Sequence, residues 1–192
     1  KAIHDKFWKE NMKKLNYWVD DALANDFSNI TIRLLTSQIE NTEGFKEGTL
    51  FLDGHDTRIE YGRLSKYGKE DYHSFKFKRT GVRTQVGMDS QELVVAVSDS
   101  LPCAPNTDMT MFTHMRLDQK IMMDKKDVLY MDGGYFLGLN NYVEQLEEEG
   151  SDLNLSNFRT PIRKLNNTQF TDGEREFNRS FGAFRGMIET LF

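Results

Sequence analysis

Two aspartates in this 192-residue chain each follow a short apolar run and precede a glycine, in LFLDG (50–54) and LYMDGG (129–134). An acid in such a position is costly to desolvate unless a cation, a hydrogen bond or a substrate receives it. A third acid, Glu189, comes one residue after Ile188, at the edge of an apolar helical stripe. Three such carboxylates supply hard oxygen ligands for two Mg²⁺ or Mn²⁺ ions about 3.5–4 Å apart, as two-metal phosphoryl transfer requires.

In a site of this kind, one ion activates water or a 3′-hydroxyl as the nucleophile, and the other stabilises the leaving oxygen. We therefore expect Asp53, Asp132 and Glu189 to be both catalytic residues and metal ligands. The alternative for a lone aspartate at a strand end is a turn former or a helix cap. Spacing alone leaves that alternative open.

The order of the predicted elements explains how the two aspartates would meet. The segment 48–54 predicts a strand, and 82–89 and 92–98, joined by a turn, predict an antiparallel hairpin. A helix over 108–123 precedes a further strand at 128–131. A right-handed crossover through that helix would place the later strand parallel to and beside the first one. Both aspartates would then lie at one edge of the sheet.

Helical periodicity predicts the remaining elements. Apolar residues recur at helical spacing over residues 1–40, which indicates a helical lead-in. The segment NNYVEQLEEEG (140–150) is typical of a solvent-facing helix that ends at its glycine. Thr171 and Glu174 form a capping box that predicts the start of a last helix. The apolar stripe of that helix consists of Phe177, Phe181, Phe184, Ile188 and Leu191.

Length and composition limit the class of protein. A chain of 192 residues with 38% hydrophobic content can bury one substantial core. The formal charge of −5 argues against a protein that coats nucleic acid over its whole surface, but it leaves room for a local basic strip. A single cysteine, no secretory signal and no apolar run that would cross a bilayer favour the cytoplasm or the nucleus. The start at Lys1 and the helical pattern up to Phe192 indicate a fragment of a longer protein.

A basic island lies between residues 58 and 83 of this acidic chain. Its lysines and arginines outnumber the neighbouring acids Glu60, Glu70 and Asp71. Cations in such a strip bind the phosphates of a DNA backbone without reading its bases. The alternative is an ordinary solvated strand and loop. The candidate DNA contacts are Lys76, Lys78, Arg79 and Arg83.

Further motifs occur in order between about residue 45 and residue 192. They are LFLDG, YHSFKFKRTGVRTQVGMD (72–89), PNTD (105–108), YMDGGY, TPIRK (160–164) and FTDGEREFNRSFGAFRGMIETLF (170–192). The first three resemble the first-aspartate element, the Y-S-x-K-x-x-x-H-x-x-K-x-Q stretch and a further acid-bearing segment of PIF/Harbinger-type transposases. The last three resemble the D-x-GY element, the TP-Y/F-R/K segment and the L-T-x-x-E-x-x-F-N…R-x-x-[IV]-E helix of the same DDE endonuclease domain.

This resemblance implies an α/β fold of the RNase H-like type, in which helices flank a mixed sheet of an antiparallel hairpin plus parallel strands. It divides the chain into a helical lead-in at 1–45 and a DDE catalytic domain at 46–192, truncated at its C-terminus. It also implies that the acid triad falls on Asp53, Asp132 and Glu189 and holds two Mg²⁺ or Mn²⁺ ions.

The implied activity is that of a metal-dependent DNA endonuclease and strand-transferase. Water attacks a phosphodiester bond at a transposon end, and the freed 3′-hydroxyl then attacks target DNA. The implied partners are double-stranded DNA, a Myb-like DNA-binding protein and further copies of the chain, in the nucleus and away from membranes. Two rivals stay open: a domesticated or decayed copy that binds DNA or a protein partner without catalysis, and a cellular nuclease of the same fold that acts on RNA–DNA hybrids.

Three residues near the motifs have open roles. Asp56 in DGHD competes with Asp53 as the first acid, because the family more often has D-G-T there. Asp108 matches the further family acid, either as a cap of its helix or as a support for the site. Arg185 lies four residues before Glu189 on one helical face. There it would orient the carboxylate, grip a phosphate or form a simple surface ion pair.

Other positions depart from the family pattern or carry weaker signals. Gly133 in DGGY stands where the family more often has a side chain, and Gly81 lies where a histidine is common. The four histidines share no metal-ligand spacing, which argues against a zinc site. Cys103 has no evident basic partner, which favours a buried loop residue over a nucleophile.

Overall fold

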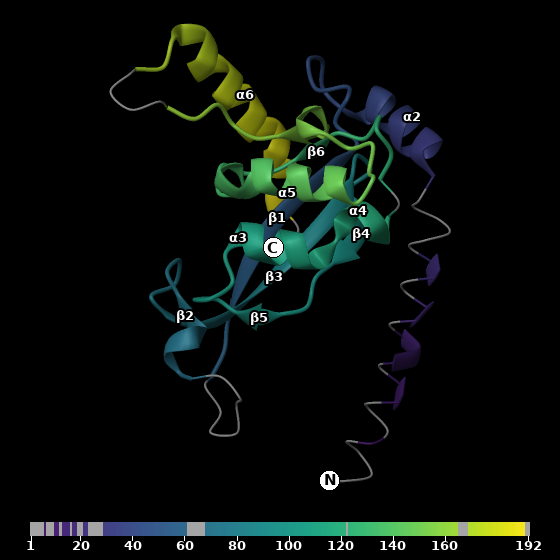
Figure 1. Ribbon diagram of the computed structural model, residues 1–192. Helices are drawn as coiled ribbons and strands as arrows, with labels where there is room; N and C mark the ends of the chain where they lie inside the picture. The colour runs from purple at the N-terminus through teal and green to yellow at the C-terminus, as the bar shows by residue number, and fades with distance from the viewer. Residues whose placement is uncertain are drawn as a thin grey trace.

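The computed structural model describes residues 29–60, 68–121, 123–164 and 169–190, and before them only positions 6, 10, 11, 13–15, 17, 18, 21 and 22 (Figure 1). Its strands are β1 (Leu50–Arg58), β2 (His73–Ser74), β3 (Arg79–Asp89), β4 (Val94–Val97), β5 (Leu101–Pro102), β6 (Leu129–Tyr130) and β7 (Phe158–Arg159). Its helices are α2 (Ile30–Glu40), α3 (Asp108–Met115), α4 (Leu117–Lys120), α5 (Phe136–Glu148) and α6 (Asp172–Glu189), with short 3₁₀ turns η2 (Glu70–Tyr72) and η3 (Leu155–Asn157).

The described strands form one mixed sheet in the order β2-β3-β1-β6-β7, with β4 and β5 also paired to β3. Leu50 lies opposite Leu129 in the parallel pair of β1 and β6, whereas β3 is antiparallel to both β1 and β4. The predicted parallel neighbours and the predicted hairpin are therefore confirmed. The chain is an α/β protein whose curled, partly parallel sheet is flanked by helices.

β1 is longer than its apolar run predicts, and this changes the surroundings of Asp53. Because β3 pairs with β1 along its whole length, the strand continues to Arg58. The prediction that Asp53 ends the strand is therefore wrong, since the residue lies in mid-strand, opposite Val86. The parallel neighbour β6 nevertheless ends at Tyr130. Asp53 thus lies just past the point where the parallel pairing stops.

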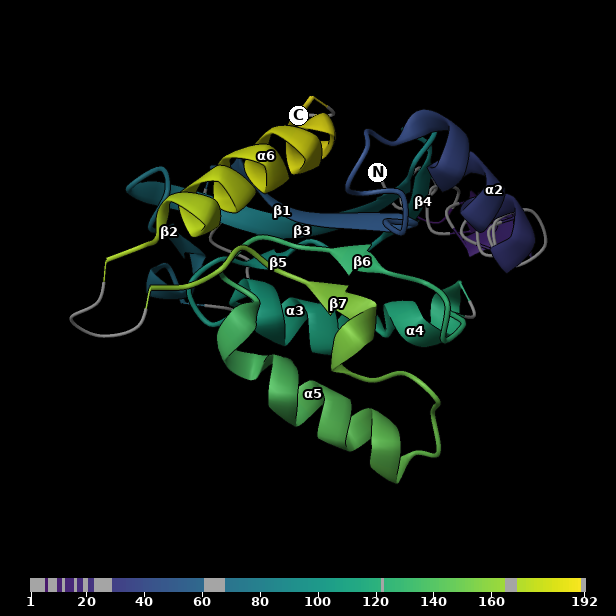
Figure 2. The same ribbon diagram turned by 90° about the horizontal axis from the view of Figure 1, so that it is seen from above.

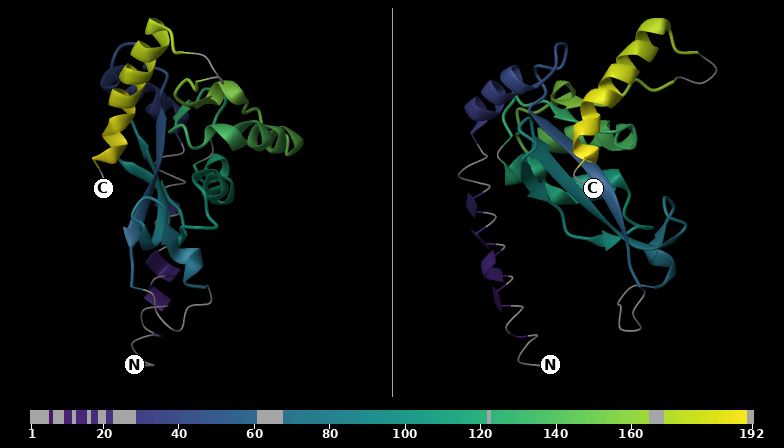
Figure 3. Two further views of the ribbon diagram at one scale, coloured as in Figure 1. Left: turned by 90° about the vertical axis from the view of Figure 1, so that its left-hand side faces the viewer. Right: turned by 180° about the vertical axis from the view of Figure 1, so that it is seen from behind.

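Helices cover both faces of the sheet, and Figures 2 and 3 show α6 on one face and α3, α4 and α5 on the other. Side chains of a strand alternate between the two faces. Accordingly, Leu50 and Leu52 pack with α3 and α5, whereas Phe51 packs with α6. The same alternation directs Asp53 toward α6. The aromatic core under α6 consists of Phe45, Phe51, Tyr130, Phe181 and Phe184.

The start of α6 and the end of α5 follow the predicted signals. The hydroxyl of Thr171 accepts a hydrogen bond from the Glu174 N–H, and the Glu174 carboxylate accepts one from the Thr171 N–H. This confirms the capping box of α6. Of the predicted stripe, Phe181, Phe184 and Ile188 are buried, Phe177 is 37% exposed and Leu191 lies outside the described residues. α5 begins at Phe136, earlier than expected, and the chain leaves it through Gly150 in the left-handed region.

The helix predicted over 108–123 is in fact two helices. Arg116 adopts a left-handed backbone conformation with φ of 48°, which ends α3 and begins α4. Its guanidinium donates hydrogen bonds to Asp118 and Glu149. One partner is two residues away and the other 33 residues away, and together they offset the strain of a left-handed arginine. No helix in the described part of the chain is both long and apolar enough to span a membrane.

A buried ion pair attaches α2 to the sheet. Arg33 donates to the two carboxylate oxygens of Asp127 at 2.9 and 2.6 Å, and both side chains are at most 2% exposed. The Thr49 hydroxyl donates to the same carboxylate at 2.7 Å. The predicted helix is thus confirmed over Ile30–Glu40. Its packing is not that of an apolar face, however, because Arg33 is buried and Leu35 is 60% exposed.

Candidate active site

Asp53 and Glu189 meet at Arg185, on the face of the sheet that α6 covers. Arg185 Nη1 lies 3.5 Å from Asp53 Oδ1, and its Nη2 lies 2.8 Å from Glu189 Oε1. Asp53 and Arg185 are 18% and 13% exposed, whereas Glu189 is 60% exposed. Arg185 is therefore more than a partner of its own helix, because it also joins α6 to β1.

Asp132 and Asp108 face one small space above two glycines. A Cβ atom at Gly134 would lie 2.9 Å from Asp132 Oδ1 and 3.3 Å from Asp108 Oδ2, and one at Gly54 would lie 2.6 Å from Asp108 Oδ1. The Gly134 N–H donates to Asp132 Oδ1 at 2.6 Å. A Cβ atom at Gly133 would have no atom within 4 Å. A side chain at Gly133 would thus leave the site unobstructed, whereas one at Gly54 or Gly134 would displace the carboxylates of Asp108 or Asp132.

Asp108 is a fourth acid of this group rather than a helix cap. Thr107 caps α3, because its hydroxyl accepts the N–H of Thr110. The Asp108 carboxylate instead lies 3.3 Å from Nη1 of Arg83. Burial raises the pKa of Asp108 above its ordinary value, Arg83 opposes the rise, and the charge of Asp132 adds to it. The supporting role is therefore the alternative that the geometry favours.

Asp53 also has a raised pKa. Burial is the main cause, the positive charge of Arg185 and a hydrogen bond from the Gly54 N–H oppose it, and the charges of Asp132 and Glu189 add to it. The three predicted acids therefore act on one another electrostatically. A group of like charges in a partly buried position is stabilised when a cation binds among them.

Asp56 belongs to a structural network beside the acids. It is 1% exposed, and it accepts hydrogen bonds from Arg83 Nε at 2.7 Å and from the Ser74 hydroxyl at 2.6 Å. Burial disfavours its charge, but these bonds and the Arg83 charge outweigh burial and hold its pKa below the ordinary value. Asp53 is therefore preferred over Asp56 as the first acid. Arg83 is directed inward to two aspartates, so we remove it from the candidate DNA contacts.

The sequence reasoning did not single out Gln85 and Tyr135, which hold the acids in place. Gln85 Nε2 donates to the backbone oxygen of Asp108 at 2.5 Å and to the Tyr135 hydroxyl at 2.8 Å. Both side chains are fully buried. Burial raises the pKa of Tyr135 well above its usual range, and Asp108 and Asp132 contribute to the rise. No local pattern singled out Gln85, which follows Arg83 and Thr84 in β3.

The acids fit a hard divalent cation. Among the described residues, no three His, Cys, Asp or Glu side chains are already arranged around a metal position. Arg185 supplies the positive charge between Asp53 and Glu189, and its Nη1 is buried without a hydrogen-bond acceptor in the described part of the chain. Carboxylate oxygens are the donors that Mg²⁺ and Mn²⁺ prefer. Asp53, Asp132 and Glu189 are therefore the residues that would hold such a cation.

The cysteine does not contribute a nucleophile to the site. Cys103 is 4% exposed, which confirms the expectation of a buried residue. Burial, together with the negative charge of Asp56, raises the pKa of its thiol to about 11. Near neutral pH it is a protonated thiol, which is a poor nucleophile.

Replacing Gly134 by alanine should weaken Mn²⁺ binding about tenfold or more, the loss typical of disturbed ligand orientation. The added methyl group would push against Asp132 and Asp108. Gly133→Ala is the matched control, because its methyl group meets no atom within 4 Å. Titration calorimetry with Mn²⁺ measures both affinities. Equal affinities for the two variants would show that the acids do not face a shared cation position.

Asp108→Asn should raise the melting temperature of the metal-free protein at neutral pH, because it removes a charge that burial disfavours. The pKa of Asp108 is raised in the folded state, so its charge destabilises the fold as pH increases from 3.8 through the raised pKa. The gain should therefore disappear at pH values below 3.8. Thermal melts from pH 3 to 8 in EDTA test this, and a variant less stable than the parent at pH 7 would contradict it.

Comparisons of the chain with protein-family models, with curated proteins and with solved structures find no match.

Proposed function

We propose that this chain is the RNase H-like catalytic domain of a metal-dependent DNA endonuclease and strand-transferase of the PIF/Harbinger transposase type, which works in the nucleus. The observation that carries the proposal is the convergence of Asp53, Asp108 and Asp132 with Glu189, from β1, α3, the end of β6 and α6. The motif resemblance and the parallel pairing of β1 with β6 support it. Double-stranded DNA at transposon ends and targets is the proposed substrate.

The acids and their neighbours have separable roles in this chemistry. Asp53, Asp132 and Glu189 would hold two Mg²⁺ or Mn²⁺ ions, and Asp108 would support them. The bound ions would supply a more acidic water or 3′-hydroxyl and would stabilise negative charge on the leaving oxygen. Gln85 and Tyr135 fix the start of α3, and therefore the position of Asp108. Arg185, if released from Asp53, would hold a phosphate oxygen.

The test is a nicking assay with supercoiled plasmid DNA, paired with Mn²⁺ titration calorimetry. The proposal expects nicked circles in Mg²⁺ or Mn²⁺, none in EDTA, and heat from bound Mn²⁺. DNA binding with neither nicking nor Mn²⁺ heat would overturn it in favour of a domesticated or decayed binding protein. Faster cleavage of an RNA–DNA hybrid than of duplex DNA would overturn it in favour of a cellular nuclease.

Partners follow from the same proposal. A Myb-like protein would supply recognition of the transposon ends, and further copies of the chain would hold two DNA ends together. Both remain proposals that pull-down with nuclear extract and sedimentation measurements check.

A further inference from the structure

The turn between β2 and β3 holds an aromatic ring in solvent. Phe75 is 67% exposed, whereas Phe77, two residues later, is partly buried with the Arg58 guanidinium 4.9 Å from its ring centre. The Phe75 and His73 rings form a T-shaped pair, with ring centres 5.1 Å apart and an interplanar angle of 87°. Lys78 Nζ lies 6.0 Å from the Phe75 ring centre. The ring is therefore largely exposed to solvent, and a basic side chain lies beside it.

Hydrogen bonds make this turn rigid. The Ser74 carbonyl accepts the Lys78 N–H at 2.8 Å, and the Ser74 hydroxyl accepts the Phe77 N–H at 3.1 Å. The same hydroxyl donates to Asp56. Lys78 completes the turn with a left-handed φ of 56°. A side chain held on a fixed backbone loses less conformational entropy on binding, so the exposed position of Phe75 is suited to recognition.

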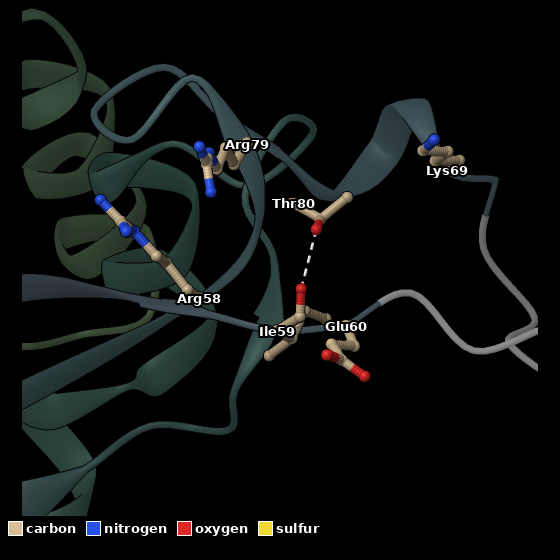
Figure 4. A pocket seen from close by; sticks show the side chains of 6 residues that line it. All are labelled: Arg58, Ile59, Glu60, Lys69, Arg79 and Thr80. Atoms are coloured by element: carbon tan, nitrogen blue, oxygen red, sulfur yellow. Dashed lines mark hydrogen bonds between the residues drawn. The ribbon is translucent and has the colours of Figure 1, made fainter.

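An open cavity of about 550 Å³ lies beside the turn, and Figure 4 shows its cations. Arg58 and Arg79 lie on one side of it and Lys69 on the other, and Glu60 also lines it. The Thr80 hydroxyl donates to the Ile59 carbonyl at 2.8 Å, which connects β3 to the residue that follows β1. Two guanidinium groups and an ammonium outnumber the one carboxylate, so the cavity carries a net positive charge that suits a phosphate.

The positive charge of this surface is not neutralised by ion pairs. Within the described ranges, the cations of the turn and cavity have no carboxylate within 4 Å, whereas Arg83, Arg116 and Arg185 all form ion pairs. These exposed cations are therefore available to an anionic ligand, although the chain as a whole has a net charge of −5. The cluster consists of Arg58, Lys69, Lys76, Lys78 and Arg79.

We infer that this surface, the turn 74–79 with the adjoining cavity, binds DNA at an unpaired base: Phe75 stacks on the base, and Arg58, Lys69 and Arg79 hold the neighbouring phosphates. Stacking on aromatic side chains and phosphate contacts are the two components of single-strand binding. The surface lies at the far end of β1, five residues beyond Asp53. That separation is about 17 Å along the strand, or roughly five base pairs of DNA. The inference depends on the proposed function only for the choice of DNA as the nucleic acid.

Fluorescence polarisation in EDTA tests this inference without any catalytic step, so its failure is distinct from failure of the proposed nuclease activity. The probes are a fully paired duplex and the same duplex with one unpaired base. Phe75→Ala should weaken binding to the second probe about tenfold or more and leave the paired duplex nearly unchanged. Phe75→Trp should retain the binding, with quenched indole fluorescence on complex formation.

Leu155→Ala, which removes another exposed apolar side chain, is the matched control and should bind both probes like the parent. Arg58→Gln and Arg79→Gln should each lower the slope of log affinity against log salt by about 1, for both probes. Unchanged affinity of Phe75→Ala for the unpaired-base probe, or an equal loss for both probes, would overturn stacking on an unpaired base. Unchanged salt slopes in the arginine variants would overturn the phosphate assignment.

Discussion

Replacing Asp132 by asparagine should lower metal-dependent DNA nicking by roughly 1000-fold or more, the equivalent of about 4 kcal/mol of transition-state stabilisation. Asparagine keeps the size of the side chain but lacks the negative charge that a divalent cation requires. Its carbonyl oxygen still accepts the Gly134 N–H that Asp132 Oδ1 accepts. The fold should therefore persist, and circular dichroism and thermal melts would show it.

The matched control is Asp152→Asn, which removes one negative charge from an exposed position outside the acid group. It should nick DNA at the rate of the parent. Full nicking by the Asp132 variant would remove that residue from the catalytic set. The Asp53→Asn variant then separates two explanations. If it loses nicking activity while the Asp132 variant keeps it, the catalytic acids lie elsewhere in the group and only the choice of Asp132 is wrong. If both variants keep full activity, the site itself is wrong.

Replacing Asp127 by asparagine should lower the free energy of unfolding by about 3–5 kcal/mol, the cost of leaving one partner of a buried ion pair uncompensated. Arg33 would remain 2% exposed with its two charge-assisted bonds weakened. The Thr49 hydroxyl, which also binds Asp127, would lose its carboxylate acceptor. Urea denaturation at neutral pH measures the change.

Two comparisons isolate the buried pair. Asp172→Asn breaks a surface pair with Arg175, whose side chains are 97% and 56% exposed, and should give no measurable change. The double variant Arg33→Met with Asp127→Leu removes both charges and should recover much of the loss. Equal destabilisation by the buried and the surface substitution would refute the role of this pair in attaching α2 to the sheet.

The sequence was sufficient for features that depend on local pattern and chain connectivity. Apolar runs placed β1 and β6, and the right-handed crossover between them made the strands parallel neighbours. The capping box placed the start of α6, because Thr171 and Glu174 satisfy each other's backbone within one turn. Spacing together with the motif resemblance selected Asp53, Asp132 and Glu189, which the structure brings into one electrostatic environment.

Other features depended on partners far away in the sequence. β1 extends past Asp53 because β3 provides hydrogen bonds up to Arg58, and no local signal revealed that pairing. Asp108 was undecided between cap and support until Thr107 proved to be the cap. The polar packing of α2 could not be predicted from local sequence either. Arg33 can be buried because it forms an ion pair with Asp127, which lies 94 residues later in the chain.

The sequence by itself therefore determined which acids are candidates for the site and the order of the strands and helices that carry them. Only the tertiary structure decided which side chains lie next to these acids. Arg185 lies between Asp53 and Glu189, Asp108 lies beside Asp132, and Asp56 pairs with Arg83 instead. The physical reason is that strand and helix patterns fix the direction of a side chain. Charge pairing and desolvation depend on what the rest of the chain places within a few ångströms.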